Sequence, residues 1–229
     1  MLRPQSILIL SGGLDSAVSS AIAVEKTKPI LALTFNYGQK AAMQEINAAS
    51  KIAAFLKVPH KTIQIPWLAE LTKTALVSPQ KNPPKLDEAS LSNKALVVDT
   101  AAQVWVPNRN GLFLNIAATF AESLDAPWIV TGFNKEEAMT FPDNSSAFIQ
   151  TADEFFRYST QTKVRVTSYT LEWDKVEIAK QAKERHIPIQ DLWFCYLGEE
   201  KPCTTCESCV RDFRALRIAG IPNPWKEKK

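Results

Sequence analysis

A short apolar run followed at once by a glycine turn is the feature that most limits how this chain can fold. Residues 7–10 (ILIL) are typical of a buried strand, and residues 11–16 (SGGLDS) lead directly into a helical pattern. Gly12 and Gly13 have no Cβ, so their backbone N–H groups can approach an anion at the positive end of a helix. Ser11 and Ser16 add hydroxyl groups, and the Asp15 carboxylate could cap the helix or hold Mg²⁺. The order predicts a site for the pyrophosphate of a nucleotide, with an ordinary loop as the alternative.

Apolar runs and helical patterns alternate along the rest of the chain. Strands are predicted at residues 7–10, 30–35, 61–65, 128–131 and 164–166, and helices over 40–56, 112–123 and 174–185. Asp174 and Glu177 form an N-cap and N3 pair at the start of the last helix. The alternation predicts an α/β fold with a Rossmann-like, doubly wound parallel sheet and ligands at the carboxyl ends of its strands.

Two segments depart from this alternation. Residues 66–107 carry Pro79, Pro83 and Pro84 together with several Lys and Ser, which predicts an irregular insertion. We expect a partly ordered lid or dimer contact there, with a surface excursion as the alternative. The predicted domains are an α/β domain over residues 1–190 and a small C-terminal segment over 191–229, whose last residues, 225–229, we expect to be a solvated tail.

Composition excludes some classes of protein. The chain has 229 residues, 45% of them hydrophobic and 22% charged, as in a globular protein with a substantial core. A net charge of +3 is too small to indicate a nucleic-acid partner. No apolar run reaches the roughly 18–20 residues needed to cross a bilayer, and the N-terminus does not have the pattern of a signal peptide. We expect a cytoplasmic protein with no membrane partner.

All four cysteines lie in the C-terminal segment. Cys203, Cys206 and Cys209 form CxxCxxC, and Cys195 precedes them across a loop. Thiolates at this spacing can converge on one tetrahedral Zn²⁺, which four protein ligands would make structural. An iron–sulfur cluster is an alternative, and disulfides are disfavoured in a reducing compartment.

The phosphate loop resembles the SGGxDS loop of the N-type ATP pyrophosphatases. Taken with the four cysteines, the chain is similar to the 7-cyano-7-deazaguanine synthase family of that superfamily. Further matches are Tyr37-Gly38-Gln39 for YGQ, residues 106–110 (VPNRN) for VPGRN, Phe141-Pro142-Asp143 for YPD, and a lysine, Lys175, that opens a late helix. The resemblance implies the adenine nucleotide alpha hydrolase fold and conversion of 7-carboxy-7-deazaguanine, ammonium and ATP to the nitrile. It also implies Mg²⁺ with the ATP, one structural Zn²⁺ and a homodimer.

The resemblance also implies roles for individual residues. The expected catalytic residues are Asp15, Ser16, Arg109 and Lys175. The expected ATP-binding residues are Leu10, Ser11, Gly12, Gly13, Leu14, Asp15, Ser16, Ala17, Val18, Ser19, Ser20, Tyr37 and Gln39. The expected substrate-binding residues are Arg109, Asn110, Asn134, Glu137, Phe141 and Asp143. We expect His60 and His186 to be structural or solvated.

The chain departs from the family pattern between residues 137 and 147. Glu137 replaces an Asp, residues 144–145 (NS) replace Cys-Arg, and Ala147 replaces a Glu, while Asn108 replaces the Gly of VPGRN. These changes leave open a related ligase that transfers a similar acid to another amine. A zinc-knuckle RNA-binding module is a further alternative, because arginines follow the cysteines at 211, 214 and 217. We expect those arginines to form a solvated or partner-binding face.

Overall fold

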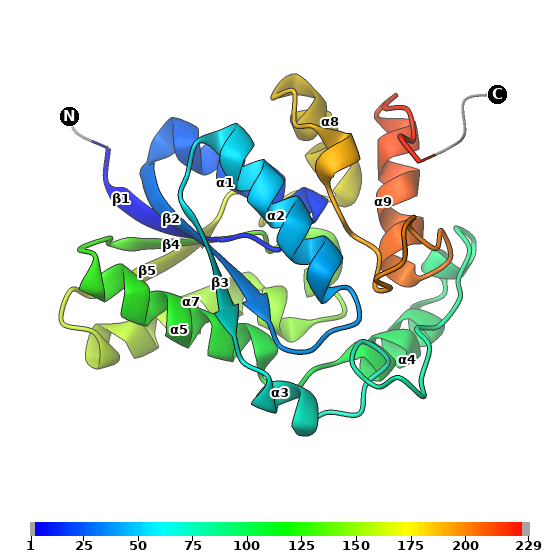
Figure 1. Ribbon diagram of the computed structural model, residues 1–229, viewed down its shortest axis with the longest axis horizontal. Helices are drawn as coiled ribbons and strands as arrows, with labels where there is room; N and C mark the ends of the chain where they lie inside the picture. The colour runs from blue at the N-terminus through cyan, green and yellow to red at the C-terminus, as the bar shows by residue number, and fades with distance from the viewer. Residues whose placement is uncertain (1–2, 226–229) are drawn as a thin grey trace.

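A five-stranded parallel sheet forms the centre of the part of the chain that the structure describes, residues 3–225 of a computed structural model (Figure 1). The strands are β1 (Gln5–Ile9), β2 (Lys28–Asn36), β3 (His60–Gln64), β4 (Trp128–Thr131) and β5 (Arg165–Ser168). Their order is β3-β2-β1-β4-β5, and each pairing is parallel. The chain therefore extends the sheet first on one side of β1 and then on the other. This doubly wound arrangement confirms the predicted fold class.

Helices cover both faces of the sheet. The buried cluster on one face contains residues of α1 (Leu14–Lys26), α2 (Ala42–Leu56), α8 (Lys175–Glu184) and α9 (Glu207–Ile218). The buried cluster on the other face contains residues of α5 (Arg109–Ser123) and α7 (Ser146–Ser159). Leu8 belongs to the first cluster and its neighbour Ile7 to the second, and both are fully buried. Successive side chains of a strand point to opposite faces, so apolar residues at both positions are what a sheet covered on both sides requires.

Helix ends follow local side-chain chemistry. Asp174 accepts a hydrogen bond from the Glu177 N–H at 2.8 Å, which confirms the predicted cap of α8. The α5 helix begins earlier than predicted, directly after Asn108, which takes a left-handed conformation with φ of 50°. The sequence analysis did not predict α7, although Ser145 caps it by accepting from the Phe148 N–H at 3.2 Å. Three shorter helical elements lie between the strands and helices named so far: α6 (Lys135–Ala138), η2 (Pro142–Asn144) and η3 (Ile189–Asp191).

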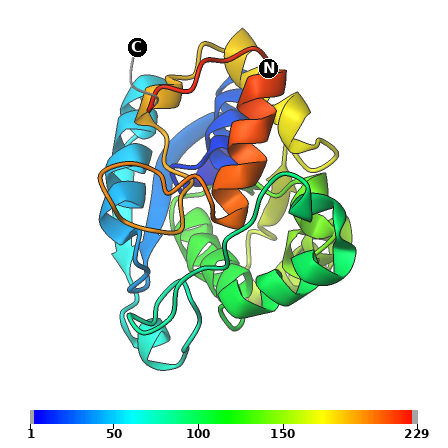
Figure 2. The ribbon, with the colours of Figure 1, turned by 90° about the vertical axis from the view of Figure 1, so that its right-hand side faces the viewer.

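The insertion at residues 66–107 is more ordered than predicted. It contains α3 (Trp67–Glu70), η1 (Ser90–Ser92) and α4 (Lys94–Val104). Val97, Ala101 and Val104 recur at helical spacing and are buried, so the prediction of an irregular segment is wrong for α4. The insertion lies beside the cysteine segment (Figure 2), where the Leu86 N–H donates to the Thr205 carbonyl at 2.7 Å.

The C-terminal segment shares a core with the sheet. Phe194, Cys209 and Leu216 belong to the same buried cluster as Leu10. Trp225 is half-buried and lies edge-on against Phe194, with ring centroids 5.4 Å apart, so the predicted solvated tail is wrong at this residue. The rest of that tail, 226–229, lies outside the described residues. None of the helices described over residues 3–225 is long and apolar enough to span a membrane.

Candidate active site

A cavity of about 240 Å³ lies at the carboxyl ends of β1, β2 and β4. Leu10, Thr34 and Thr131 mark those strand ends and line the cavity. The first turns of α1 and α5 and one face of α9 supply other parts of its wall. The reversal of strand order beside β1 leaves space for a ligand at this edge, where the sequence predicted a site.

Hydroxyl groups close the phosphate loop on itself. The Ser11 and Ser16 hydroxyl oxygens lie 3.0 Å apart, and the Ser16 hydroxyl donates to the Gly13 carbonyl at 3.1 Å. Gly13 is the N-cap of α1, and no side chain caps the helix. The first N–H groups of α1 therefore remain available to an anion in the cavity.

Glycine is required at two places where this loop touches its neighbours. Gly12 has φ of 84°, and a Cβ there would lie 2.8 Å from the Ala48 side chain and the Ala49 backbone of α2. A Cβ on Gly132, at the end of β4, would lie 2.5 Å from the Ser16 nitrogen. The loop is thus fixed by close backbone packing on both sides.

Lys175 is the centre of a buried charge cluster. Its ammonium nitrogen lies 2.5 Å from an Asp15 oxygen, 3.2 Å from Glu137 and 3.4 Å from Asp212. The side chains of Lys175 and Asp212 are 2% and 1% exposed. The four charged groups come from α1, α6, α8 and α9, so tertiary packing alone brings them together.

Burial shifts the pKa values of this cluster. It raises the pKa of Asp15 to about 7, although the ammonium of Lys175 opposes the shift. Burial also raises the pKa of Asp212, and the ammonium of Lys175 again opposes the shift. For Lys175, burial acts to lower the pKa, but the carboxylates of Asp15, Asp212 and Glu137 together outweigh it and hold the pKa well above its usual value. The lysine is therefore a permanent cation among carboxylates that compete for it.

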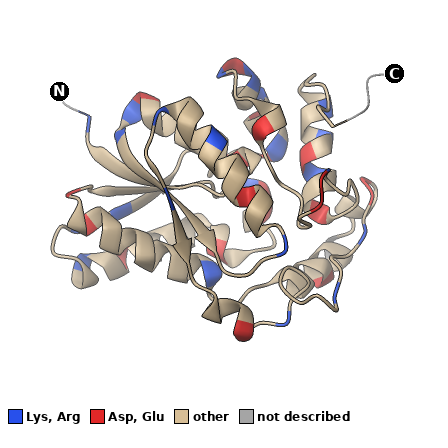
Figure 3. Ribbon diagram, viewed as in Figure 1, with Lys and Arg blue, Asp and Glu red and all other residues tan. Residues whose placement is uncertain are grey.

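A second ion network joins α9 to α6. Arg211 donates to Glu136 at 2.6 Å and to Glu207 at 2.7 Å, and Arg214 donates to Glu136 at 2.7 Å. Glu136 in turn accepts from the Lys175 backbone N–H at 3.3 Å. Arg211 is buried and ion-paired, so the prediction of a solvated or partner-binding arginine face is wrong for it. Charges of both signs are interspersed on α8 and α9 (Figure 3).

The opposite wall of the cavity is aromatic. Phe35 and Phe113 stack with ring centroids 4.0 Å apart, and the Tyr37 hydroxyl accepts from Arg109 at 3.2 Å. Phe141, from the segment that departs from the family pattern, also lines this wall. A planar heteroaromatic ring with polar edges suits such a surface.

The structure brings most of the predicted site residues to the cavity. Those that line it are Leu10, Ser11, Gly13, Leu14, Asp15, Ser16, Tyr37, Arg109, Asn110, Glu137, Phe141 and Lys175. Those that lie outside its lining are Gly12, Ala17, Val18, Ser19, Ser20, Gln39, Asn134 and Asp143. Asn134 caps α6 by accepting from the Glu137 N–H at 2.9 Å. Gln39 donates to Glu45 at 2.7 Å and so holds a carboxylate that does line the cavity.

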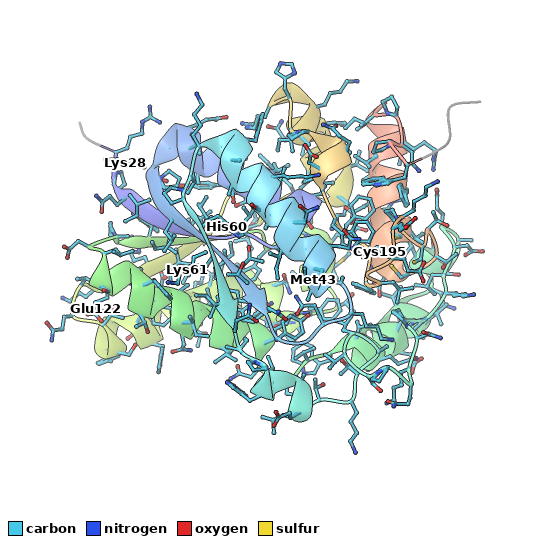
Figure 4. All side chains as sticks on the ribbon, in the orientation of Figure 1. Lys28, Met43, His60, Lys61, Glu122 and Cys195 are labelled. Atoms are coloured by element: carbon cyan, nitrogen blue, oxygen red, sulfur yellow. The ribbon has the colours of Figure 1, made fainter. Side chains whose placement is uncertain are left out.

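Several lining residues were missed from the sequence. The main ones are Thr34, Phe35, Phe113, Phe133, Trp193, Phe194, Tyr196, Glu207, Ser208, Arg211 and Asp212. Asp212 carries the clearest signal, because it lies three residues after Cys209 and so near the same face of a helix. As for the histidines, His60 (labelled in Figure 4) has a ring nitrogen 2.8 Å from the Thr34 hydroxyl, as expected of a structural residue.

The four cysteines meet at one point beside the first turns of α9, where Figure 4 labels Cys195. Their sulfur atoms all lie within 4.8 Å of one another, and those of Cys203 and Cys209 are 4.0 Å apart. Zn–S bonds of about 2.3 Å at tetrahedral angles put sulfur atoms roughly 3.8 Å apart, so the residues fit Zn²⁺. The N–H groups of Leu197 and Cys203 point at the Cys195 sulfur at 3.4 and 3.3 Å, which favours a thiolate.

Comparison with known proteins assigns this architecture to a family. The family model described as "Queuosine biosynthesis protein QueC" matches residues 5–220. The chain belongs to the QueC family. The 7-cyano-7-deazaguanine synthase of Pelotomaculum thermopropionicum is 49% identical over 217 residues, which are 95% of this chain and 98% of that protein. The synthase of Desulforamulus reducens is 48% identical over 219 residues, covering 96% of each chain. The synthase of Methanosarcina barkeri is 43% identical over 227 residues, covering 98% of each.

Membership of the QueC family confirms the resemblance predicted from the phosphate loop and the cysteines. It places the chain among the enzymes of queuosine biosynthesis. The matched residues, 5–220, include the five strands, the residues that line the cavity and the four cysteines. The cavity is therefore the candidate active site of a QueC-family enzyme.

Proposed function

We propose that the protein converts 7-carboxy-7-deazaguanine and ammonium to 7-cyano-7-deazaguanine at the expense of ATP. The observation that carries the proposal is the SGGLDS loop, whose uncapped helix end opens into a cavity with one aromatic wall, in a chain of the QueC family. Such a site can hold a triphosphate at one end and a flat heterocycle at the other.

The proposed reaction has two activations. A carboxylate oxygen of the acid attacks the α-phosphorus of ATP, and pyrophosphate leaves to give an acyl adenylate. Ammonia adds to the acyl carbon and displaces AMP, which gives an amide. The amide oxygen attacks the α-phosphorus of a second ATP and pyrophosphate leaves, and loss of AMP and of both amide N–H protons then yields the nitrile. The protein contributes positioning and charge neutralisation rather than a covalent nucleophile.

Roles follow from where the side chains lie. The hydroxyl groups of Ser11 and Ser16 and the first N–H groups of α1 bind the phosphates. Lys175 neutralises charge on the leaving pyrophosphate. Arg109, held by the Tyr37 hydroxyl, binds the acid, together with Asn110, Glu137 and Phe141. We assign Asn134 and Asp143 to the support of this end of the site.

Mg²⁺ fits the phosphate end of the cavity. The second carboxylate oxygen of Asp15 is buried and has no hydrogen-bond donor among the described residues, and a carboxylate oxygen is a ligand that Mg²⁺ prefers. The ion would neutralise phosphate charge there. One Zn²⁺ held by the four cysteines would be structural, because four protein ligands leave no open position. We further propose a cytoplasmic homodimer with no nucleic-acid or membrane partner, built from an α/β domain over 1–190 and a zinc segment over 191–229.

The test is turnover by the purified, zinc-loaded protein with 7-carboxy-7-deazaguanine, ammonium chloride, Mg²⁺ and ATP. We expect the nitrile by mass spectrometry, with AMP and pyrophosphate formed at two per nitrile by the steps above, and no product from Asp15→Ala. Pyrophosphate release without amide or nitrile would overturn the proposal. If amine acceptors then restored AMP release, the related ligase would be favoured, for which the altered segment at 137–147 is the motive.

A further inference from the structure

The charge cluster in the cavity wall has more carboxylates than cations. Asp15, Glu137 and Asp212 all face the single ammonium group of Lys175, at 2.5, 3.2 and 3.4 Å. Placing uncompensated charge in a buried site is unfavourable: burial raises the pKa values of Asp15 and Asp212, and a bound cation would relieve the same excess of negative charge.

A second observation points to the same cation. Asp212 is 1% exposed, and its Oδ1 atom has no hydrogen-bond donor, although Lys175 lies at 3.4 Å. Asp212 lines the cavity, so this oxygen belongs to the wall of the site. Arg211 and Arg214 of α9 are already committed, because both are paired with Glu136.

We propose that Asp212, with Glu137, holds the ammonium ion that supplies the nitrile nitrogen. The inference rests on the proposed function and deepens it, because it assigns the nitrogen substrate to named side chains. Each carboxylate would accept an N–H of the ammonium ion in a charge-assisted hydrogen bond.

The geometry favours ammonium over a second magnesium ion. The distances from the carboxylates to the lysine nitrogen, 2.5 to 3.4 Å, show that this cluster is spaced for N–H donors. Mg²⁺ needs oxygens at about 2.0–2.1 Å in an octahedron that keeps several waters. Asp212 is almost fully buried, which leaves little room for such a hydration shell. ATP with its magnesium ion arrives with net negative charge, so the demand for a cation persists when it binds.

The experiment compares two nitrogen nucleophiles in Asp212→Asn. Ammonium is a cation, whereas hydroxylamine is neutral at pH 8 and traps an acyl adenylate as a hydroxamate, with release of AMP and a proton. We expect kcat/KM for ammonium to fall by about 10- to 100-fold, the value of a hydrogen bond to a charged group, while the value for hydroxylamine falls less than about threefold. The apparent KM for Mg²⁺ should stay unchanged.

A second site variant and a remote control keep the result interpretable. Glu137→Gln should lower the ratio of kcat/KM for ammonium to that for hydroxylamine in the same direction but by a smaller factor, because Glu137 is 32% exposed. This ratio cancels any loss that comes from binding of the acid, so it decides the matter if Asp212→Asn does not fold. Asp99→Asn, on the exposed side of α4, should leave both reactions at the wild-type rate.

Three outcomes would overturn the inference. Equal losses with both nucleophiles would mean that Asp212 only positions Lys175. Unchanged kinetics with ammonium would mean that no such subsite exists. A shift in the Mg²⁺ requirement alone would identify a divalent-cation site. Failure of the wild-type chain to use ammonium at all would instead count against the proposed function.

Discussion

The two ends of the Lys175 cluster are built in different ways. The phosphate loop places Ser11 to Ser16 by local means, since a strand end, a glycine turn and a helix start follow one another directly. The other end of the cluster takes Arg211 and Asp212 from α9, almost two hundred residues later. Lys175 joins them, with Asp15 on one side and Asp212 on the other.

Because one end of the cluster lies on α9, the cysteine segment has a second structural role, which is to position both ends of the cavity. The α9 helix begins directly after Cys206 and contains Cys209, so a metal ion at the cysteines would hold the first turns of the helix that carries Asp212. The same segment also contacts the phosphate loop, because the Trp193 N–H donates to the Gly12 carbonyl at 2.9 Å. A site described as structural therefore supports both ends of the cavity.

Breaking the cysteine site should have the largest effect. For Cys209→Ser, or after treatment with a strong chelator, we expect a loss of several kcal/mol of stability and a fall in Tm of about 10 °C or more, because structural zinc contributes directly to folding. Pyrophosphate release should be lost as α9 leaves the cavity wall. Calorimetry with measurement of bound zinc tests this. Full activity in protein shown to be free of metal would contradict the coupling of the two regions.

The second-largest effect is expected from removing Lys175, the lysine that both ends of the cluster share. Lys175→Met leaves three carboxylates without their cation, and breaking a buried pair in this way costs about 3–5 kcal/mol. The loss should be smaller at pH 5 than at pH 8, because burial raises the pKa values of Asp15 and Asp212 and their protonation relieves the repulsion. Denaturant unfolding at both pH values measures it, with Lys180→Met as the matched control on the exposed face of α8. A pH-independent loss would indicate lost packing rather than charge.

Substitutions at the adjacent Gly12 and Gly13 distinguish the residue that the fold of the loop requires from the one that it does not. Gly12→Ala should destabilise the protein by about 2–3 kcal/mol, since the new Cβ would meet α2 at 2.8 Å and φ is 84°. Gly13→Ala has only ordinary contacts, the nearest at 3.4 Å, so its stability should change by less than about 1 kcal/mol. Thermal unfolding measures the change in stability of each variant, and the apparent Kd for ATP measures the effect of each variant on nucleotide binding. Equal destabilisation by both changes would contradict this account of the loop.

The pH dependence of nucleotide binding has the smallest expected effect, and it tests the phosphate-loop end of the Lys175 cluster. Burial raises the pKa of Asp15 to about 7, and a magnesium ligand must be ionised, so the ion with ATP should displace a proton. Affinity should then be constant above pH 8 and weaken about tenfold for each unit below pH 7. Titration calorimetry in buffers of different ionisation enthalpy detects the proton. Asp15→Asn should remove this slope, and a slope that persists in the variant would place the titration elsewhere.

Much of the fold could be predicted, because its strands and helix caps depend on residues that are close together in the chain. The strands β1 to β5 were each anticipated to within a few residues, and so was the cap of α8 by Asp174, because periodicity and capping depend on near neighbours. Ordered helices were missed where prolines and polar residues dominate the surroundings, as in α4, whose buried face is defined by packing against the rest of the chain.

By itself, the sequence determined the alternating strand and helix pattern of a parallel sheet, the anion loop and a four-thiolate site, since each of these signals is carried by residues close together in the chain. Only the tertiary structure decided that Asp212, Glu137 and Asp15 share one lysine and that Arg211 is buried in an ion network. The reason is physical. Charge balance in a cavity depends on which distant helices pack together, and the spacing of residues along the chain does not encode that distance.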